Sequence, residues 1–112
     1  MGRFYSEEAM GALRARFEAK VLKWPGVKGR QMFGCPCYDA GKMFAFLATG
    51  GVVVTKLSHA DRAALSKRRG VAPFQPMGRA VQKWLQIPVK SAKEMDAAVA
   101  WVERSYRAAR GM

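Results

Sequence analysis

The feature that most constrains the fold is a change in apolar spacing along the chain. Helical spacing, with an apolar residue every three or four positions, follows Ser6 and Ser91, and a third segment opens with the capping pattern of Ser58. A serine hydroxyl in this place accepts a hydrogen bond from the first turn of a helix. Between these segments lie runs of β-branched and aromatic residues bounded by glycine and proline. Strands in runs, not alternating with helices, predict an α+β domain.

The expected elements follow from these patterns. Helices are predicted over residues 7–23, 58–69 and 91–109, and strands over residues 30–38, 43–48, 52–57 and 79–87, with 71–78 as an extended loop. The order is helix, three strands, helix, one or two strands, helix. This predicts a two-layer sandwich, a mainly antiparallel sheet with helices packed on one face (α-β-β-β-α-β-β-α at most). The predicted core contains Phe17, Phe44, Phe46, Val53, Leu85, Val99 and Val102.

Length and composition predict one domain over residues 1–112. A chain of 112 residues with 50% hydrophobic residues can build a core without a disulfide or a metal. The N-terminus lacks the apolar run of a signal peptide, and no apolar stretch approaches the ~20 residues that span a bilayer. We therefore expect a cytoplasmic protein with no membrane contact.

The charge is strongly unbalanced. Lysine and arginine number 20 against 8 acidic residues, a formal net charge of +12. Such a field attracts polyanions, but it also keeps a domain soluble, and cations suit the C-terminal ends of helices. The sequence leaves open whether these residues are dispersed or form a patch for nucleic acid or a partner. The candidates for partner or nucleic-acid contact are Lys67, Arg68, Arg69, Arg79, Arg104, Arg107 and Arg110.

Residues with reactive side chains form no catalytic pattern. Cys35 and Cys37 would share one face of a strand, but their spacing is not that of a usual zinc pair, so we expect two buried, reduced thiols without metal. His59 is the single histidine and follows a helix cap. The carboxylates fall at helix starts, in a turn or alone. No catalytic residue, metal site or cofactor is predicted, and we expect no enzyme.

Several short motifs together resemble one family. They are Met32-Phe33-Gly34-Cys35-Pro36-Cys37, Gly41-Lys42-Met43-Phe44-Ala45, Lys56-Leu57, Asp61-Arg62, Pro73-Phe74, Gly78-Arg79, Trp84-Leu85 and Ile87-Pro88. Over roughly residues 10–108 the chain resembles the TfoX N-terminal domain-like proteins. The resemblance implies an antiparallel α/β sandwich, here as a stand-alone domain, and no established catalytic residues. Longer members carry a second domain and are linked to the regulation of competence for DNA uptake.

Three classes of function remain after this comparison. The first is a non-catalytic binding or regulatory domain that acts through an unidentified protein partner or as a homodimer. The second is a nucleic-acid-binding domain that contacts phosphates and is linked to transcription or DNA uptake. The third, an enzyme or metal protein centred on the two cysteines, has the least support in the residues. The sequence favours the first class.

Overall fold

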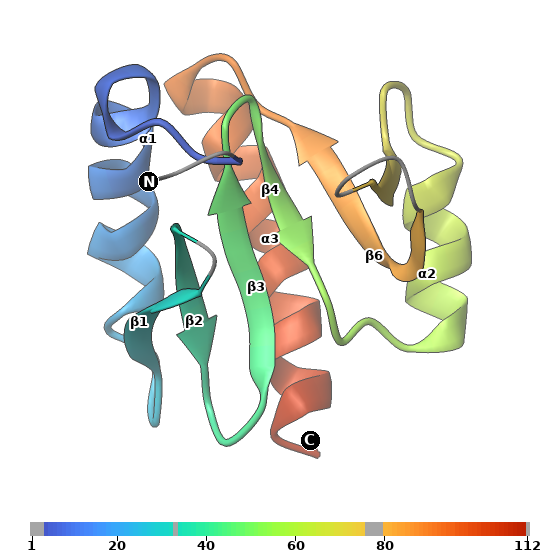
Figure 1. The fold of residues 1–112 in the computed structure, drawn as a ribbon. Helices are drawn as coiled ribbons and strands as arrows, with labels where there is room; N and C mark the ends of the chain where they lie inside the picture. Colours follow the sequence, from blue (N-terminus) through green and yellow to red (C-terminus); the bar gives the residue numbers. More distant parts are fainter. Residues whose placement is uncertain (1–3, 33, 76–79, 112) are drawn as a thin grey trace.

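The computed structural model describes residues 4–32, 34–75 and 80–111. Within them the predicted α+β class is confirmed (Figure 1). The elements in chain order are α1 (Glu7–Val21), β1 (Lys28–Met32), β2 (Cys35–Asp39), β3 (Met43–Ala48), β4 (Gly51–Val54), α2 (His59–Ser66), β5 (Ala72–Phe74), β6 (Val81–Pro88) and α3 (Ala92–Ala109). All three serines act as predicted: Ser6, Ser58 and Ser91 cap α1, α2 and α3 by accepting a hydrogen bond from the first turn.

The strands form one antiparallel sheet in the order β1-β2-β3-β4-β6-β5. The sequence predicted a single strand over residues 30–38, and this was wrong, because the segment folds into the β1–β2 hairpin. Met32 lies opposite Cys35, and Gly34 has a φ of 78°, a backbone angle that favours glycine at a reversal. The part predicted as a loop also contains a strand, since Ala72–Phe74 pairs with β6 as the other sheet edge.

Different elements pack against the two faces of the sheet. Tyr38, Ala45, Val54 and Leu85 form one row across the central strands, and the ring of Tyr38 lies 4.9 Å from that of Phe17 in α1. This face is therefore covered by α1 and α3; in Figure 1, α3 runs behind the central strands and α1 stands at the left edge of the sheet. The helix α2 packs against β6.

The opposite face carries the row of Cys37, Phe46 and Val53. The Phe46 ring contacts Phe74 edge-on at 5.1 Å and Trp84 at 5.5 Å. Both faces thus contribute to the core, and every predicted core residue is buried: Phe17, Phe44, Phe46, Val53, Leu85, Val99 and Val102.

A β-bulge breaks the alternation in β3. Tyr38 pairs with Ala45, but the next pair is Asp39 with Met43, which leaves Phe44 as the extra residue. Phe44 consequently faces the helices and not the side of Phe46. Its ring lies 6.3 Å from Trp24 and 5.3 Å from Tyr106 of α3.

Among the described residues, no helix combines the length and the apolar character needed to cross a bilayer.

Candidate binding surfaces

Two of the predicted cationic contact residues on α3 are paired with carboxylates. Arg104 Nη1 lies 2.9 Å from Asp61 Oδ1 in the first turn of α2, and its guanidinium lies 5.4 Å from the centre of the Trp101 ring. Arg107 Nη2 lies 3.3 Å from Glu103 Oε2. These exposed pairs balance positive charge with negative charge, so this stretch of α3 is not a continuous basic surface.

A third predicted contact residue, Arg110, supports the fold. Its Nη1 donates to the carbonyl oxygen of Pro25 and to Tyr106 Oη, the latter at 2.9 Å. Tyr106 Oη itself donates to the same Pro25 carbonyl at 2.6 Å. Arg110 thereby fastens the end of α3 to the turn after α1 through its Nη1 group.

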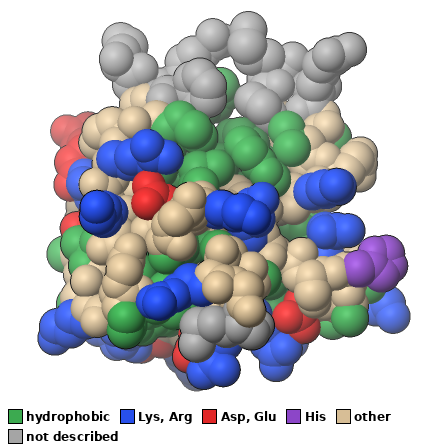
Figure 2. Space-filling model, turned by 90° about the horizontal axis from the view of Figure 1, so that it is seen from below, with side chains coloured by type: hydrophobic (Ala, Val, Ile, Leu, Met, Phe, Trp, Pro, Cys, Tyr) green, Lys and Arg blue, Asp and Glu red, His purple; other side chains and the backbone are tan. Residues whose placement is uncertain are grey.

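The remaining candidates lie elsewhere. Lys67, Arg68 and Arg69 follow the last residue of α2 and are exposed, and none has an ion pair within the described part of the chain. Asp61, the partner of Arg104, lies at the first turn of α2, so an eight-residue helix of about 12 Å separates the two cationic groups. Arg79 lies outside the described residues. Figure 2, which views the molecule from below, shows lysine and arginine scattered among other side chains.

The cysteines lie in an apolar environment. Cys35 and Cys37 are buried free thiols at 2% and 1% exposure, on the sheet face that also carries Phe46. Burial raises the pKa of both thiols, that of Cys37 to about 11. Both are therefore protonated and poorly nucleophilic near neutral pH. Within the described residues, no three side chains of His, Cys, Asp or Glu converge as a metal site would require.

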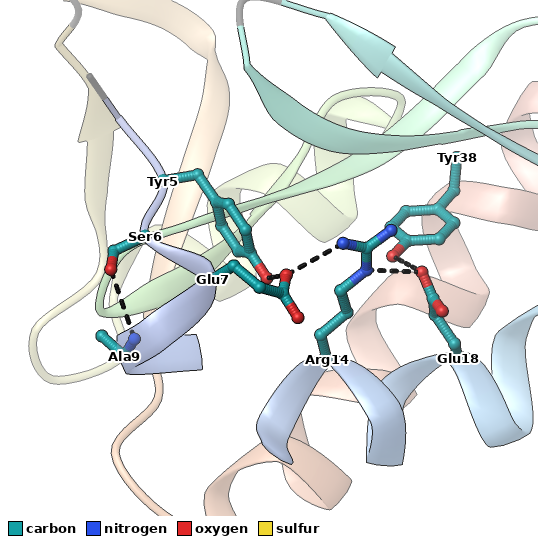
Figure 3. A network of polar contacts seen from close by, with 7 residues as sticks. All are labelled: Tyr5, Ser6, Glu7, Ala9, Arg14, Glu18 and Tyr38. Atoms are coloured by element: carbon teal, nitrogen blue, oxygen red, sulfur yellow. Dashed lines mark hydrogen bonds and ion pairs between the residues drawn. The ribbon is translucent and has the colours of Figure 1, made fainter. Parts of the chain in front are cut away.

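A polar network that the sequence did not predict joins α1 to the sheet (Figure 3). Arg14 lies between two carboxylates, with Nη1 2.9 Å from Glu7 Oε1 and Nε 2.9 Å from Glu18 Oε2. Tyr5 donates to Glu7 and Tyr38 donates to Glu18, both at 2.6 Å. The spacing of Arg14 and Glu18 by four residues was a visible signal. The two tyrosines were not, because only the fold brings them there.

A second ionic group joins α1 to α3. The guanidinium of Arg16 makes two hydrogen bonds to the Asp96 carboxylate, at 2.9 and 2.6 Å, and Lys20 Nζ lies 3.0 Å from the same group. Their hydrogen bonds hold the pKa of Asp96 well below its usual range. Like Arg14, the cations Arg16 and Lys20 therefore form ion pairs within the domain.

The outer edge of the sheet at β1 is exposed and lies beside an exposed apolar side chain. Among the described strands β1 pairs only with β2, and residues 28–31 are exposed. Beside it lies Leu22, the one large hydrophobic side chain recorded as exposed in the described chain, at 42%. A Cβ added to Gly29 would lie 3.6 Å from Leu22 Cδ2 and 3.7 Å from Tyr38 Cε1. Leu22, Gly29, Gln31 and Pro36 line a shallow groove of about 310 Å³ here.

These features define a small α+β domain with an exposed sheet edge and with its buried polar side chains hydrogen-bonded. Every buried side-chain nitrogen and oxygen in the described part has a hydrogen-bond partner. The model of the TfoX N-terminal domain family matches residues 20–109, most of the chain, and the chain belongs to that family. No curated protein and no solved structure matches it significantly.

Proposed function

We propose that this chain is a non-catalytic binding domain that acts through a protein partner, in keeping with the regulatory association of its family. The observation that carries the proposal is the exposed β1 edge beside Leu22. An edge strand offers unpaired N–H and C=O groups, to which an extended segment of another chain can add as a further strand. Leu22 and the groove at Gly29 would receive an apolar side chain of that segment.

The charges around β1 select the kind of partner. Lys28 is exposed without an ion pair among the described residues. Lys23, which follows Leu22 directly in the chain, is also exposed and unpaired there. Arg30 is 68% exposed at its side chain although it pairs with Asp39. An extended segment with acidic residues complements this edge, because opposite charges across strands stabilise the pair.

The same charges disfavour a second copy of the chain as the occupant. Two β1 strands paired antiparallel about Arg30 would place Arg30 opposite Arg30, and pairing about Gly29 would place Lys28 opposite Arg30. Like charges directly opposite one another destabilise a sheet. A foreign acidic segment therefore fits better than a homodimer.

Site-specific photo-cross-linking in the source cells tests the proposal. A cross-linking residue at Gln31, exposed on β1, should capture a protein that the same residue at Lys42, exposed in the β2–β3 turn, does not capture. The variants Leu22→Asp and Lys28→Glu should each abolish most of that capture, while the matched controls Ala97→Asp and Lys42→Glu should retain it.

Two results would contradict the proposal. Equal capture from positions 31 and 42 would show that β1 is not the contact. Capture of a second copy of this chain alone would replace the foreign partner by a homodimer.

A further inference from the structure

We infer that the end of α2 and the start of α3 form a second, independent site, which binds the phosphate backbone of double-stranded nucleic acid. The site consists of five cations, called here the cationic corner: Lys67, Arg68, Arg69, Lys90 and Lys93. It differs from the set that the sequence suggested, because Lys90 just before the cap of α3 and Lys93 in its first turn take the place of arginines near the end of that helix.

The fold brings the two parts of the cationic corner together. Gly70 packs on Pro88 so closely that an added Cβ would lie 2.9 Å from Pro88 Cγ. Lys90 follows Pro88 by two residues, so the two Cα atoms are within about 7 Å. Lys93 lies in the first turn of α3. Residues 20 or more positions apart in sequence thus share one end of the molecule (Figure 1).

The backbone of the cationic corner is held in place by hydrogen bonds. Arg68 N donates to Leu65 O at 2.9 Å, and Val71 N donates to Arg68 O at 3.2 Å. On the other side Val89 N donates to Gly50 O at 2.9 Å. Because the backbone is already fixed, binding a phosphate at these five cations would not require the backbone to become ordered.

Ion pairing distinguishes the cationic corner from six of the other basic residues, while Lys23, Lys28 and Lys42 are exposed and unpaired within the described chain as well. Arg14, Arg16, Lys20, Arg30, Arg104 and Arg107 each contact a carboxylate. Within the described chain none of the five corner residues does so. The nearest acid in sequence, Glu94, uses its carboxylate to accept a hydrogen bond from Lys90 N at 2.6 Å. Glu94 keeps its negative charge, so five cations and one carboxylate leave the corner a formal charge of +4 for an anion from outside.

The chemistry of the corner favours nucleic acid over an acidic protein. Its exposed residues, 66–70 and 90–94, include no large apolar or aromatic side chain. Protein interfaces draw most of their binding energy from buried aromatic residues and arginine, of which only arginine is present here, whereas phosphate contacts need only cations. The lack of an aromatic ring also removes the stacking that single strands use. Phosphates of a duplex remain as the best fit, and they carry no base information.

The helix dipoles explain some of the cations in the corner but not all five. Cations after α2 complement the negative end of its dipole, which would explain Lys67, Arg68 and Arg69 alone. Lys90 and Lys93 flank the positive end of α3, where the dipole disfavours them. The helix dipoles therefore do not account for Lys90 and Lys93, whereas an external anion bound at the corner would.

The test is a fluorescence anisotropy titration of the full chain with a 20-base-pair DNA duplex, a single strand of equal length and poly-glutamate. With five phosphate contacts, log K should fall with log salt at a slope of about −4 to −5. Arg68→Gln/Arg69→Gln and Lys90→Gln/Lys93→Gln should each reduce the slope by about 2. The matched control Lys42→Gln/Lys56→Gln also removes two exposed charges but lies at the opposite end, so it should leave the slope unchanged.

The outcomes are distinct. Tighter binding of the duplex than of either competitor, weakened about tenfold or more by each corner variant and not by the control, supports the inference. An equal loss in all three variants would show that the net charge acts without a site. Binding of the duplex weaker than about 10⁻⁴ M at ~150 mM salt, or tighter binding of poly-glutamate, would overturn the assignment to nucleic acid. None of these results depends on the β1 edge.

Discussion

Ser105 Oγ in α3 donates a 2.6 Å hydrogen bond to the carbonyl oxygen of Phe44, 61 residues earlier in the chain. The same hydroxyl oxygen accepts a 2.9 Å hydrogen bond from Lys56 N. Ser105 is completely buried, and Phe44 is the extra residue of the β3 bulge. One hydroxyl thus supplies partners for the backbone at the two places where the sheet loses its regular ladder, and it fixes α3 against β3 and the end of β4.

Replacing this serine by alanine should therefore destabilise the fold. Ser105→Ala removes the part-buried hydrogen bond from Lys56 N and the buried one to Phe44 O, which costs about 1–3 kcal/mol. Urea denaturation measures the change. The control Ser66→Ala removes an exposed hydroxyl that bonds Ala63 O, and its effect should stay within about 0.5 kcal/mol. Equal stabilities of the two variants would contradict the structural role of Ser105.

Ionisation of the two tyrosines of the Arg14 network, Tyr5 and Tyr38, should lower the stability of the fold in alkaline solution. Burial, followed by the hydrogen bond to Glu7, raises the pKa of Tyr5 from 10.0 to about 12, and burial raises that of Tyr38 as well. A raised pKa means that the folded state holds the proton more tightly, so this stabilisation is complete below pH 10 and is lost as the pH rises above it.

Thermal unfolding from pH 9 to 12 checks this expectation. The melting temperature should fall more steeply above pH 10 in the unmodified chain than in Tyr5→Phe/Tyr38→Phe, because the variant has no phenol to ionise at these positions. Parallel curves would show that the two phenols do not contribute.

The cysteines should be inert in the folded protein. Because the pKa of Cys37 is raised to about 11, little thiolate exists near pH 7.5, and burial blocks access. Iodoacetamide should modify both thiols rapidly in 8 M urea (about the concentration that unfolds small domains) and slowly in buffer. Cys35→Ala/Cys37→Ala should cost ~1–3 kcal/mol through lost packing. Rapid alkylation of the native chain, or zinc bound stoichiometrically after purification without added metal, would contradict this account.

Local signals predicted the helices and their caps well. The hydroxyls of Ser58 and Ser91 each accept a hydrogen bond three residues along, as the cap pattern requires. The acidic partner of a capping box was less predictable, because the carboxylate of Asp61 contacts Arg104 instead of the backbone. A competing charge 43 residues away cannot be seen in a four-residue pattern.

Features that depend on strand register were harder to predict. The bulge places Phe44 and Phe46, which strict alternation would put on one face, on opposite faces of the sheet. Only the change of register from the Tyr38–Ala45 pair to the Asp39–Met43 pair reveals it. The hairpin at Gly34 was hidden because strand residues continue on both sides of a single glycine. The candidate surfaces share this limit, since ion pairing and the contact between Gly70 and Pro88 are properties of the folded chain.

The most direct test of the proposed function is amide hydrogen exchange of the full chain with and without the protein that cross-links to position 31. Addition of a strand to β1 gives its outward amides new hydrogen bonds, so exchange within residues 28–32 should slow by at least about tenfold. Exchange in β6 should stay unchanged, and Leu22→Asp should remove the protection of β1. Unchanged exchange across residues 28–32 in the saturated complex would contradict the proposal that this edge is the binding surface.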